Sequence, residues 1–176
     1  ILKRYRSQNI KIPHELIPKE LANDPKIWDI LLPDMPLTAL LRTLGRLTSY
    51  GVIGHGQKNT DIVNDKLKDK NYIKQSRIHP LSVLIASKTY NKGGGVKGKL
   101  KWNPSPDIAS MLDDMFYAYF ENIDPTNKRI LYGVDVSGSM DFNGISGLNI
   151  TCAEIASVLA MASARTEKYY SIMGFA

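Results

Sequence analysis

The chain has 176 residues, of which 43% are hydrophobic and 23% are charged, and 23 basic against 17 acidic residues give a formal net charge of +6. This composition excludes a disordered or collagen-like chain. A single cysteine, Cys152, excludes an internal disulfide and favours a reducing compartment, the cytoplasm or, in a eukaryote, also the nucleus. No apolar run reaches the roughly 18 to 20 residues that cross a bilayer, so no membrane partner is expected. Because the chain starts at Ile1, with no methionine before Met35, we expect a piece of a longer protein.

The positive charge is concentrated in one part of the sequence. Before residue 130 there are 21 basic and 13 acidic residues, and from residue 130 onward there are 2 basic and 4 acidic ones. Residues 66–101 contain ten basic residues and a single acid, Asp69. Such a density attracts phosphates by Coulomb forces and counterion release, which indicates nucleic acid. An anionic membrane surface and an ordinary solvated face are the alternatives.

Helical periodicity dominates up to about residue 122, and it predicts helices at 25–32, 37–47, 60–70, 80–90 and 106–121. The second has a stripe of five leucines at positions 37, 40, 41, 44 and 47. The last follows Ser105, a suitable N-cap, and has Pro106 in its first turn. Five helices with short polar connections indicate an α-helical array. No repeat of fixed period is visible, so a solenoid is only a hypothesis.

A basic, glycine-rich loop is expected at residues 91–104. Its four glycines and four lysines indicate a mobile segment whose amides could approach phosphate closely. Trp102 could stack on a base, but we favour packing of Trp102 into the core because most large aromatic side chains are substantially buried. His79 precedes Pro80 at a helix start, where histidine more often anchors packing than contacts RNA.

The pattern changes at residue 129. The apolar run 129–135 predicts a buried strand, an alanine-rich segment at about 151–165 predicts a helix, and 169–176 resembles a second strand. This order is typical of a parallel βαβ unit, with Ile155, Val158, Leu159 and Ala162 facing the sheet. The short polar segment 125–128 is the expected domain junction.

Three oxygen-bearing side chains alternate where the first strand ends: Asp135, Ser137 and Ser139. Open α/β sheets place their ligand sites at this end of a strand. Carboxylate and hydroxyl oxygens suit Mg²⁺, Mn²⁺ or Ca²⁺. We therefore predict a divalent-metal site, with Mg²⁺ as the first candidate. The alternative is a loop whose serines merely cap the following turn.

Other chemistry finds no support in the sequence. There is no phosphate-binding glycine loop, no pair of cysteines for zinc, and no G-x-S-x-G around Ser137. A metal-dependent hydrolase would need a general base or nucleophile, which the serine motif lacks. We therefore expect that the chain is not an enzyme.

Three stretches together resemble the TROVE-domain proteins, the Ro 60 kDa ribonucleoprotein autoantigen family. They are MPLTALLRTLGRLTSYGVI (35–53), RIHPLSVLIASKTYNKGGGVKGKLKW (77–102) and KRILYGVDVSGSM (128–140). The resemblance covers about residues 25–176. It implies a multidomain chain: residues 1–124 would form the C-terminal part of an all-α, HEAT-like helical-repeat TROVE domain. Residues 129–176 would form the first strand–helix–strand of an α/β, Rossmann-like von Willebrand factor A domain.

The resemblance also implies a function. Members of this family bind small noncoding Y RNAs and the single-stranded 3′ ends of misfolded RNAs, act in RNA quality control, and are not known as enzymes. A nuclease is a possible protein partner of the A domain. The RNA-contacting candidates, chosen by charge density, are Lys88, Lys97, Lys99 and Lys101, followed by Arg77 and His79.

The same resemblance implies a particular type of metal site. Asp135, Ser137 and Ser139 match the first part of a metal-ion-dependent adhesion site (MIDAS), in which the serines bind the cation and the aspartate often acts through a bound water. A threonine and a second aspartate normally complete the motif from later loops, so the site is incomplete within these 176 residues. The alternative function is a metal-dependent protein-interaction module of the adhesion A-domain type.

Overall fold

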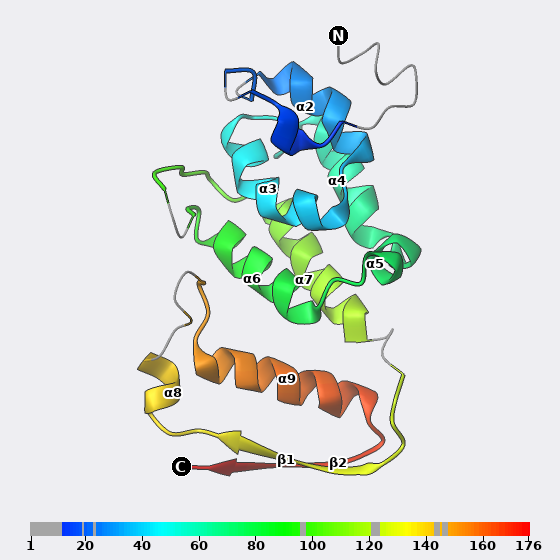
Figure 1. Ribbon diagram of the computed structural model, residues 1–176, viewed down its shortest axis with the longest axis vertical. Coiled ribbons are helices and arrows are strands. Elements are labelled where there is room, and N and C mark those ends of the chain that lie inside the picture. The colour runs from blue at the N-terminus through cyan, green and yellow to red at the C-terminus, as the bar shows by residue number, and fades with distance from the viewer. Residues whose placement is uncertain are drawn as a thin grey trace.

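The computed structural model describes residues 12–18, 20–22, 24–95, 98–120, 124–142, 145 and 148–176. In this part of the chain, a group of helices is followed by a strand–helix–strand unit (Figure 1). The helical group comprises η1 (His14–Leu16), α2 (Pro25–Leu31), η2 (Leu32–Asp34), α3 (Leu37–Ser49), α4 (Lys58–Lys68), α5 (Lys70–Ser76), α6 (Pro80–Asn91) and α7 (Pro106–Phe120). The second unit comprises β1 (Arg129–Asp135), α8 (Ser139–Phe142), α9 (Cys152–Thr166) and β2 (Tyr169–Phe175). The expected mostly helical chain with a short α/β unit at its C-terminal end is confirmed.

The leucine stripe of α3 forms the centre of the helical core. All five of its leucines are buried, as their i, i+3, i+4, i+7 spacing predicts. The core continues through α2 and α4 and along α7, whose Ile108 and Leu112 are fully buried. These helices pack into one continuous apolar cluster, which fixes the position of everything that projects from them.

The expected helix at about 60–70 is present as α4, but a second helix that was not expected, α5, follows it directly. α4 ends at Lys68, and α5 begins at Lys70. Between them the Asp69 carboxylate accepts hydrogen bonds from the backbone N–H groups of Asn71 (2.9 Å) and Tyr72 (3.0 Å), as an N-cap does. An aspartate two residues beyond the last α4 apolar position, Leu67, therefore starts a new helix rather than continuing the old one.

The expected capping role of Ser105 is also corrected. The Ser105 hydroxyl is buried and has no hydrogen-bond partner among the described residues. Instead, the Ser105 backbone N–H donates to the Tyr90 hydroxyl (3.1 Å), and the Ser105 carbonyl accepts from Ala109 in the first turn of α7. The residue thus joins α6 to the start of α7 through its main chain.

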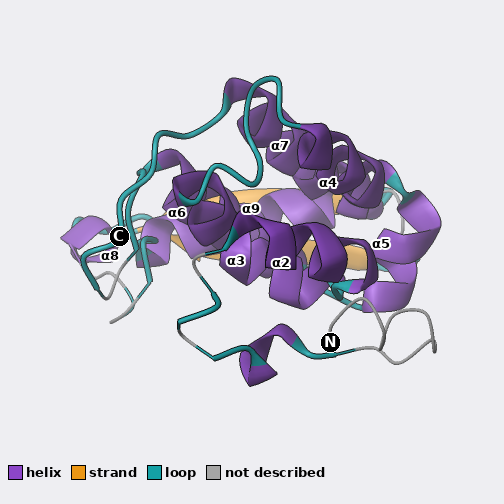
Figure 2. Cartoon of the chain, turned by 90° about the horizontal axis from the view of Figure 1, so that it is seen from above, coloured by secondary structure: helices purple, strands orange, loops and turns teal. Residues whose placement is uncertain are grey.

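The two strands pair in parallel, as the sequence predicts, with Arg129 opposite Tyr169 and Asp135 opposite Phe175. α9 provides the crossover between them and begins with a capping box. The Thr151 hydroxyl accepts from the Glu154 N–H, and the Glu154 carboxylate accepts from the Thr151 N–H. Seen from above, the strands lie beneath the helices (Figure 2).

α9 lies between the helical group and the strands (Figure 1). Its Val158 is buried in the same apolar cluster as the helical core, with Met161 and Ala162 packed against that cluster. Leu159 is exposed. Val158 was expected on the side of α9 that packs against the sheet, and this is wrong: α9 directs Val158 toward the helices. The junction is also tied down, because the Thr126 N–H donates to Glu167 just beyond α9 (2.9 Å).

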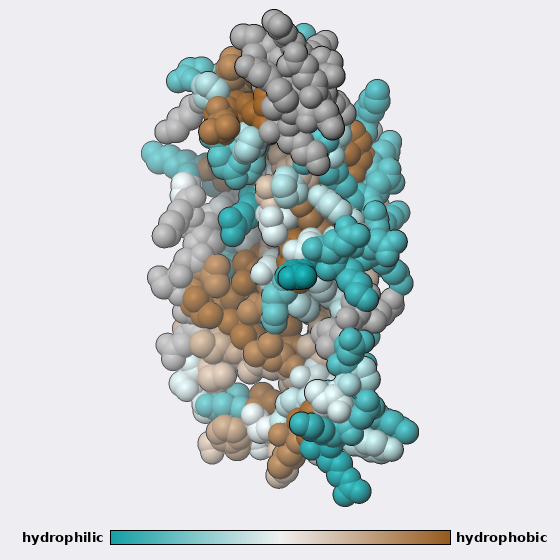
Figure 3. All heavy atoms as spheres, turned by 45° about the vertical axis from the view of Figure 1, so that its right-hand side comes forward, coloured by the Kyte–Doolittle hydropathy of each residue, from teal (hydrophilic) through white to brown (hydrophobic). Residues whose placement is uncertain are grey.

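The strand unit leaves much of its apolar surface open. Every residue of β2 is exposed, and so is Leu131 of β1. Figure 3 shows apolar surface reaching the outside in the lower half of the molecule. Among the described residues, no helix has the length and apolar character needed to span a bilayer.

Candidate metal loop and basic interface

The three candidate metal ligands, Asp135, Ser137 and Ser139, lie together in the loop at the carboxyl end of β1, which we call the metal loop. The Ser137 hydroxyl donates to Asp135 Oδ1 (2.7 Å), and the Ser137 N–H donates to the same oxygen (2.9 Å). The hydroxyls of Ser137 and Ser139 are 3.1 Å apart. The Ser137 hydroxyl thus lies within hydrogen-bonding distance of both the Asp135 carboxylate and the Ser139 hydroxyl.

The electrostatics of this loop favour an ionised carboxylate. The side-chain hydrogen bond from Ser137 lowers the pKa of Asp135 below its ordinary value, and the Ser137 backbone N–H lowers it further. Within the described ranges, no group of three histidine, cysteine, aspartate or glutamate side chains is placed to hold a metal ion. A cation here would depend on one carboxylate, two hydroxyls and water, which are the hard ligands that Mg²⁺ accepts, so the residues fit such an ion.

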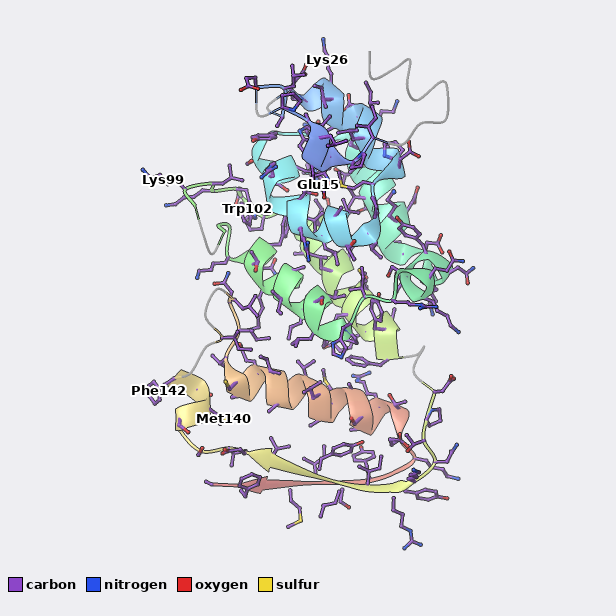
Figure 4. All side chains as sticks on the ribbon, viewed as in Figure 1. Glu15, Lys26, Lys99, Trp102, Met140 and Phe142 are labelled. Carbon is purple, nitrogen blue, oxygen red and sulfur yellow. The ribbon has the colours of Figure 1, made fainter. Side chains whose placement is uncertain are left out.

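A short helix that sequence patterns did not indicate, α8, follows directly from the metal loop. It begins at Ser139 and ends at Phe142, and the Phe142 ring is 90% exposed. Figure 4 shows Met140 and Phe142 on this helix, close to the end of β1. The metal loop is therefore flanked by apolar side chains that reach solvent.

The basic loop is fastened at its base. The Trp102 N–H donates to the Gly93 carbonyl (3.0 Å), and Gly94 pairs with Lys101 in an antiparallel bridge. Gly93 has a φ of +71°, and a Cβ built on it would lie 2.7 Å from the Trp102 carbonyl oxygen, so glycine is required there. The loop was expected to be mobile throughout, but these contacts fix its two arms.

Trp102 packs inward, which confirms the preferred prediction. Its indole N–H donates to the Tyr90 carbonyl (2.8 Å), and its ring stacks with that of Tyr90 at a centroid distance of 6.3 Å. A Cβ on Gly45 of α3 would lie only 2.6 Å from Trp102 Cη2, so the indole lies directly on the backbone of α3. Figure 4 shows Trp102 on the α3 side of the loop and Lys99 at its outer end.

The described RNA-contacting candidates lie in four different settings: the basic loop, the end of α5, the start of α6 and, for Lys88, the contact with α9. Lys99 and Lys101 are exposed on the fastened loop, while Lys97 lies outside the described residues. Arg77 ends α5 with a φ of +50°. His79 is exposed and caps α6 by accepting the Leu81 N–H on Nδ1 (3.2 Å), so it acts at the helix start without being packed.

Lys88 belongs to an interface between the two units that sequence patterns did not reveal. Its ammonium forms an ion pair with Glu154 of the α9 capping box. Nearby, the Lys92 ammonium donates to Asn149 Oδ1 (2.8 Å), and Asn149 reaches back to the Thr89 hydroxyl (3.5 Å). The Thr-x-x-Glu spacing of the capping box was a readable signal for the helix start, although nothing local pointed to Lys88.

Glu154 is held ionised by this arrangement. The hydrogen bond from Lys88 lowers the pKa of Glu154 most, and the Thr151 backbone N–H adds to the effect. The carboxylate therefore serves two elements at once: it caps α9, and it contacts α6 across the interface.

The comparisons with known proteins match both units. The TROVE domain model matches residues 8–93, and the Ro60 vWA domain model matches residues 129–176. The chain belongs to the Ro60 family of TROVE-domain proteins.

Two Ro60-family relatives show how far the similarity extends. The chain is 33% identical over 162 residues to "RNA-binding protein RO60" of Caenorhabditis elegans, covering 92% of this chain and 25% of that protein. It is 36% identical over 173 residues to the protein of the same name from Deinococcus radiodurans, covering 96% and 32%. The chain thus spans a quarter to a third of the length of these Ro60 relatives.

A solved Ro60-family structure has the same fold. The crystal structure of the Deinococcus radiodurans RO (RSR) protein superposes with a TM-score of 0.84 at 34% sequence identity, over 96% of this chain and 34% of that one. Because the superposition spans almost all of this chain, the helical group and the strand–helix–strand unit both have counterparts in that structure.

Proposed function

We propose that this Ro60-family chain is part of an RNA-binding ribonucleoprotein component that binds small noncoding RNA of the Y type and the single-stranded 3′ ends of misfolded RNA, in RNA quality control. The names of its two relatives support RNA as the partner. The finer assignments follow from the family resemblance, as do a HEAT-like repeat in the helical group and a cytoplasmic, or in a eukaryote also nuclear, location.

The fastened basic loop is the observation that carries this proposal. Lys101 is exposed at the base of the loop, where Trp102, Gly93 and Tyr90 fix the backbone, and Lys99 is exposed two residues further out. Side chains on a pre-ordered backbone lose less conformational entropy on binding than those on a mobile one. The loop can therefore offer its charges to a phosphate backbone at a low entropic cost.

The test is a salt titration of RNA binding by the full-length protein, with a labelled RNA hairpin carrying a single-stranded 3′ tail. Several phosphate contacts give a steep negative slope of log affinity against log salt, about 0.7 per contact for single strands. Charge reversal by Lys99→Glu and Lys101→Glu should weaken binding by a similar factor for unrelated RNA sequences. Lys26→Glu, on α2 at the top of the molecule and outside the basic loop (Figure 4), is the matched control. A flat salt dependence would contradict an electrostatic role of the basic loop in RNA binding.

A second candidate function rests on the gathered oxygens of the metal loop. In this interpretation Ser137 and Ser139 would hold a divalent cation, probed first with Mg²⁺, while Asp135 would orient the site through its contacts with Ser137. A bound cation would offer an open coordination position to a carboxylate of a protein partner, such as a nuclease. Asp135→Asn should abolish Mg²⁺ binding in a calorimetric titration and leave RNA affinity unchanged, and retained Mg²⁺ binding would rule the metal loop out.

The proposed role is binding without catalysis. The motif Asp135-Val-Ser-Gly-Ser139 contains one carboxylate and no histidine or cysteine, so within the motif itself there is no pair of groups for acid–base catalysis. Incubation of the purified protein with RNA and Mg²⁺ should leave the RNA intact. Turnover that disappears in Asp135→Asn would contradict this.

A further inference from the structure

A groove with both polar and apolar walls lies between the C-terminal end of α6 and the start of α9. It has a volume of about 580 Å³, and its walls come from both units. Lys88, Asn91 and Lys92 line it at the end of α6, and Asn149, Thr151 and Glu154 line it at the start of α9, with the apolar Leu148 and Ile150 beside them. The basic loop that carries Lys99 and Lys101 leaves α6 directly beyond Asn91, so it starts next to the α6 residues that line the groove (Figure 1).

The lining of this groove has the chemistry of an anion site with one acid in it. Two ammonium groups and two carboxamides supply hydrogen-bond donors, and Glu154 supplies the single negative charge. The donors are already engaged within the protein: Lys88 with Glu154, and Lys92 with Asn149 Oδ1. Each acceptor is an oxygen in a position that a phosphate oxygen could take.

The pair between Lys88 and Glu154 is poised for exchange. The two side chains retain 34% and 38% of their exposure, and ion pairs with this access to water contribute little to stability. Glu154 also does not depend on Lys88 for its other role, since Oε2 accepts from the Thr151 N–H while Oε1 faces Lys88. Lys88 can therefore leave Glu154 without uncapping α9.

We propose that this groove is a phosphate-binding extension of the RNA surface, in which Lys88 and Lys92 hold RNA phosphates and Glu154 occupies Lys88 until RNA displaces it. The inference rests on the proposed RNA-binding function. It adds a site at the junction of the two units and gives Glu154 the role of an internal competitor. RNA that enters the groove then contacts the helical group and the A-domain unit together.

Glu154→Gln tests the competition without destroying the helix start. Glutamine can also complete a capping box, so the variant removes the negative charge and keeps the acceptor for Thr151. We expect the full-length variant to bind the labelled hairpin RNA about two- to fivefold more tightly at low salt, the range that a weak ion pair spans. Unchanged or weaker binding would overturn the proposal.

Lys88→Met and Lys92→Met test the two lysines, which the proposal places in contact with RNA phosphates. Each should weaken RNA binding and reduce the salt slope by about one contact, whereas Lys26→Met should change neither. A purely structural contact between the units would make Lys88→Met and Glu154→Gln shift affinity in the same direction, because both break the same pair. Opposite directions are therefore the signature of competition, and equal directions contradict it.

The outcome separates this inference from the function on which it rests. If the wild-type protein binds the hairpin with a steep salt slope and loop charge reversal weakens it, while Glu154→Gln has no effect, only the groove is excluded. If the wild-type protein shows no salt-dependent RNA binding, the proposed function itself fails. Thermal unfolding of each variant verifies that the fold is intact.

Discussion

The helical group and the strand–helix–strand unit bury their apolar side chains to very different extents. Leu40 at the centre of α3 is 0% exposed, whereas Leu131 in β1 is 65% exposed. The helices enclose one another, but the two strands have α9 on one face only (Figure 1). The same residue type therefore contributes strongly to stability in one region and weakly in the other, because hydrophobic stabilisation follows the area removed from water.

α9 belongs to both regions, and its contacts change in kind along its length. At its start Glu154 pairs with Lys88, in its middle Val158 is buried with the helical core, and near its end Arg165 lies 5.0 Å from the ring of Tyr117 on α7. The less enclosed region is thus held by the more enclosed one through polar, apolar and cation–π contacts in turn.

The largest expected effect comes from truncating matched leucines in the two regions. Leu40→Ala should lower the free energy of unfolding by about 2 to 5 kcal/mol, because it leaves a cavity in a closed core. Leu131→Ala should change it by no more than about 0.5 kcal/mol, as at other exposed positions. Urea unfolding of the full-length protein measures both. Equal losses would show that the difference in burial does not carry over to stability.

The contact between Gly45 and Trp102 gives a smaller effect within the helical group. Gly45→Ala places a methyl group against the indole and should cost about 1 to 3 kcal/mol through overpacking. Combining it with Trp102→Phe, which shortens the ring, should recover part of this loss. A double-mutant cycle of thermal unfolding measures the coupling. Strictly additive losses would mean that the two residues do not meet.

The smallest expected effect is a titration shift at the interface. Because the folded pKa of Glu154 is lowered, its contribution to stability is complete above its ordinary pKa and is lost as the pH falls below 4.5 through the lowered value. Lys88→Met should raise the Glu154 pKa toward its ordinary value, and carboxyl-resonance NMR titration measures this. Arg165→Met, at the far end of α9, should leave it unchanged. An identical Glu154 pKa in the wild type and in Lys88→Met would contradict the ion pair.

Elements set by local patterns could be predicted from the sequence. The α3 leucine stripe, the position of α7 and the parallel pairing of β1 with β2 all follow from periodicity and element order. The grouping of Asp135, Ser137 and Ser139 also follows, since alternate residues of one short loop cannot lie far apart. The family resemblance, carried by whole stretches, was confirmed by both family models.

Features that depend on distant partners could not be predicted. The Lys88–Glu154 pair joins residues 66 positions apart, so charge density alone placed Lys88 among free RNA contacts. Val158 has the spacing of a buried helix residue, but it packs toward the helices and not toward the sheet. Periodicity predicts which side of a helix is buried, but it does not predict which element covers that side. The start of α5 at Asp69 was missed for a local reason: one capping residue outweighed a continuous helical pattern.

The hydrogen bond from Thr126 to Glu167 limits how the two regions can move. It joins the connecting segment to the residue just beyond α9, while the other end of α9 is held at Lys88. Because α9 makes contacts at both ends, the connecting segment 124–128 is not a freely flexible linker between the two units. Reorientation of the A-domain unit must break the Lys88–Glu154 pair, the burial of Val158 and the contact of Arg165 with Tyr117, so the stiffness of the junction depends on the whole length of α9 rather than on the length of the linker.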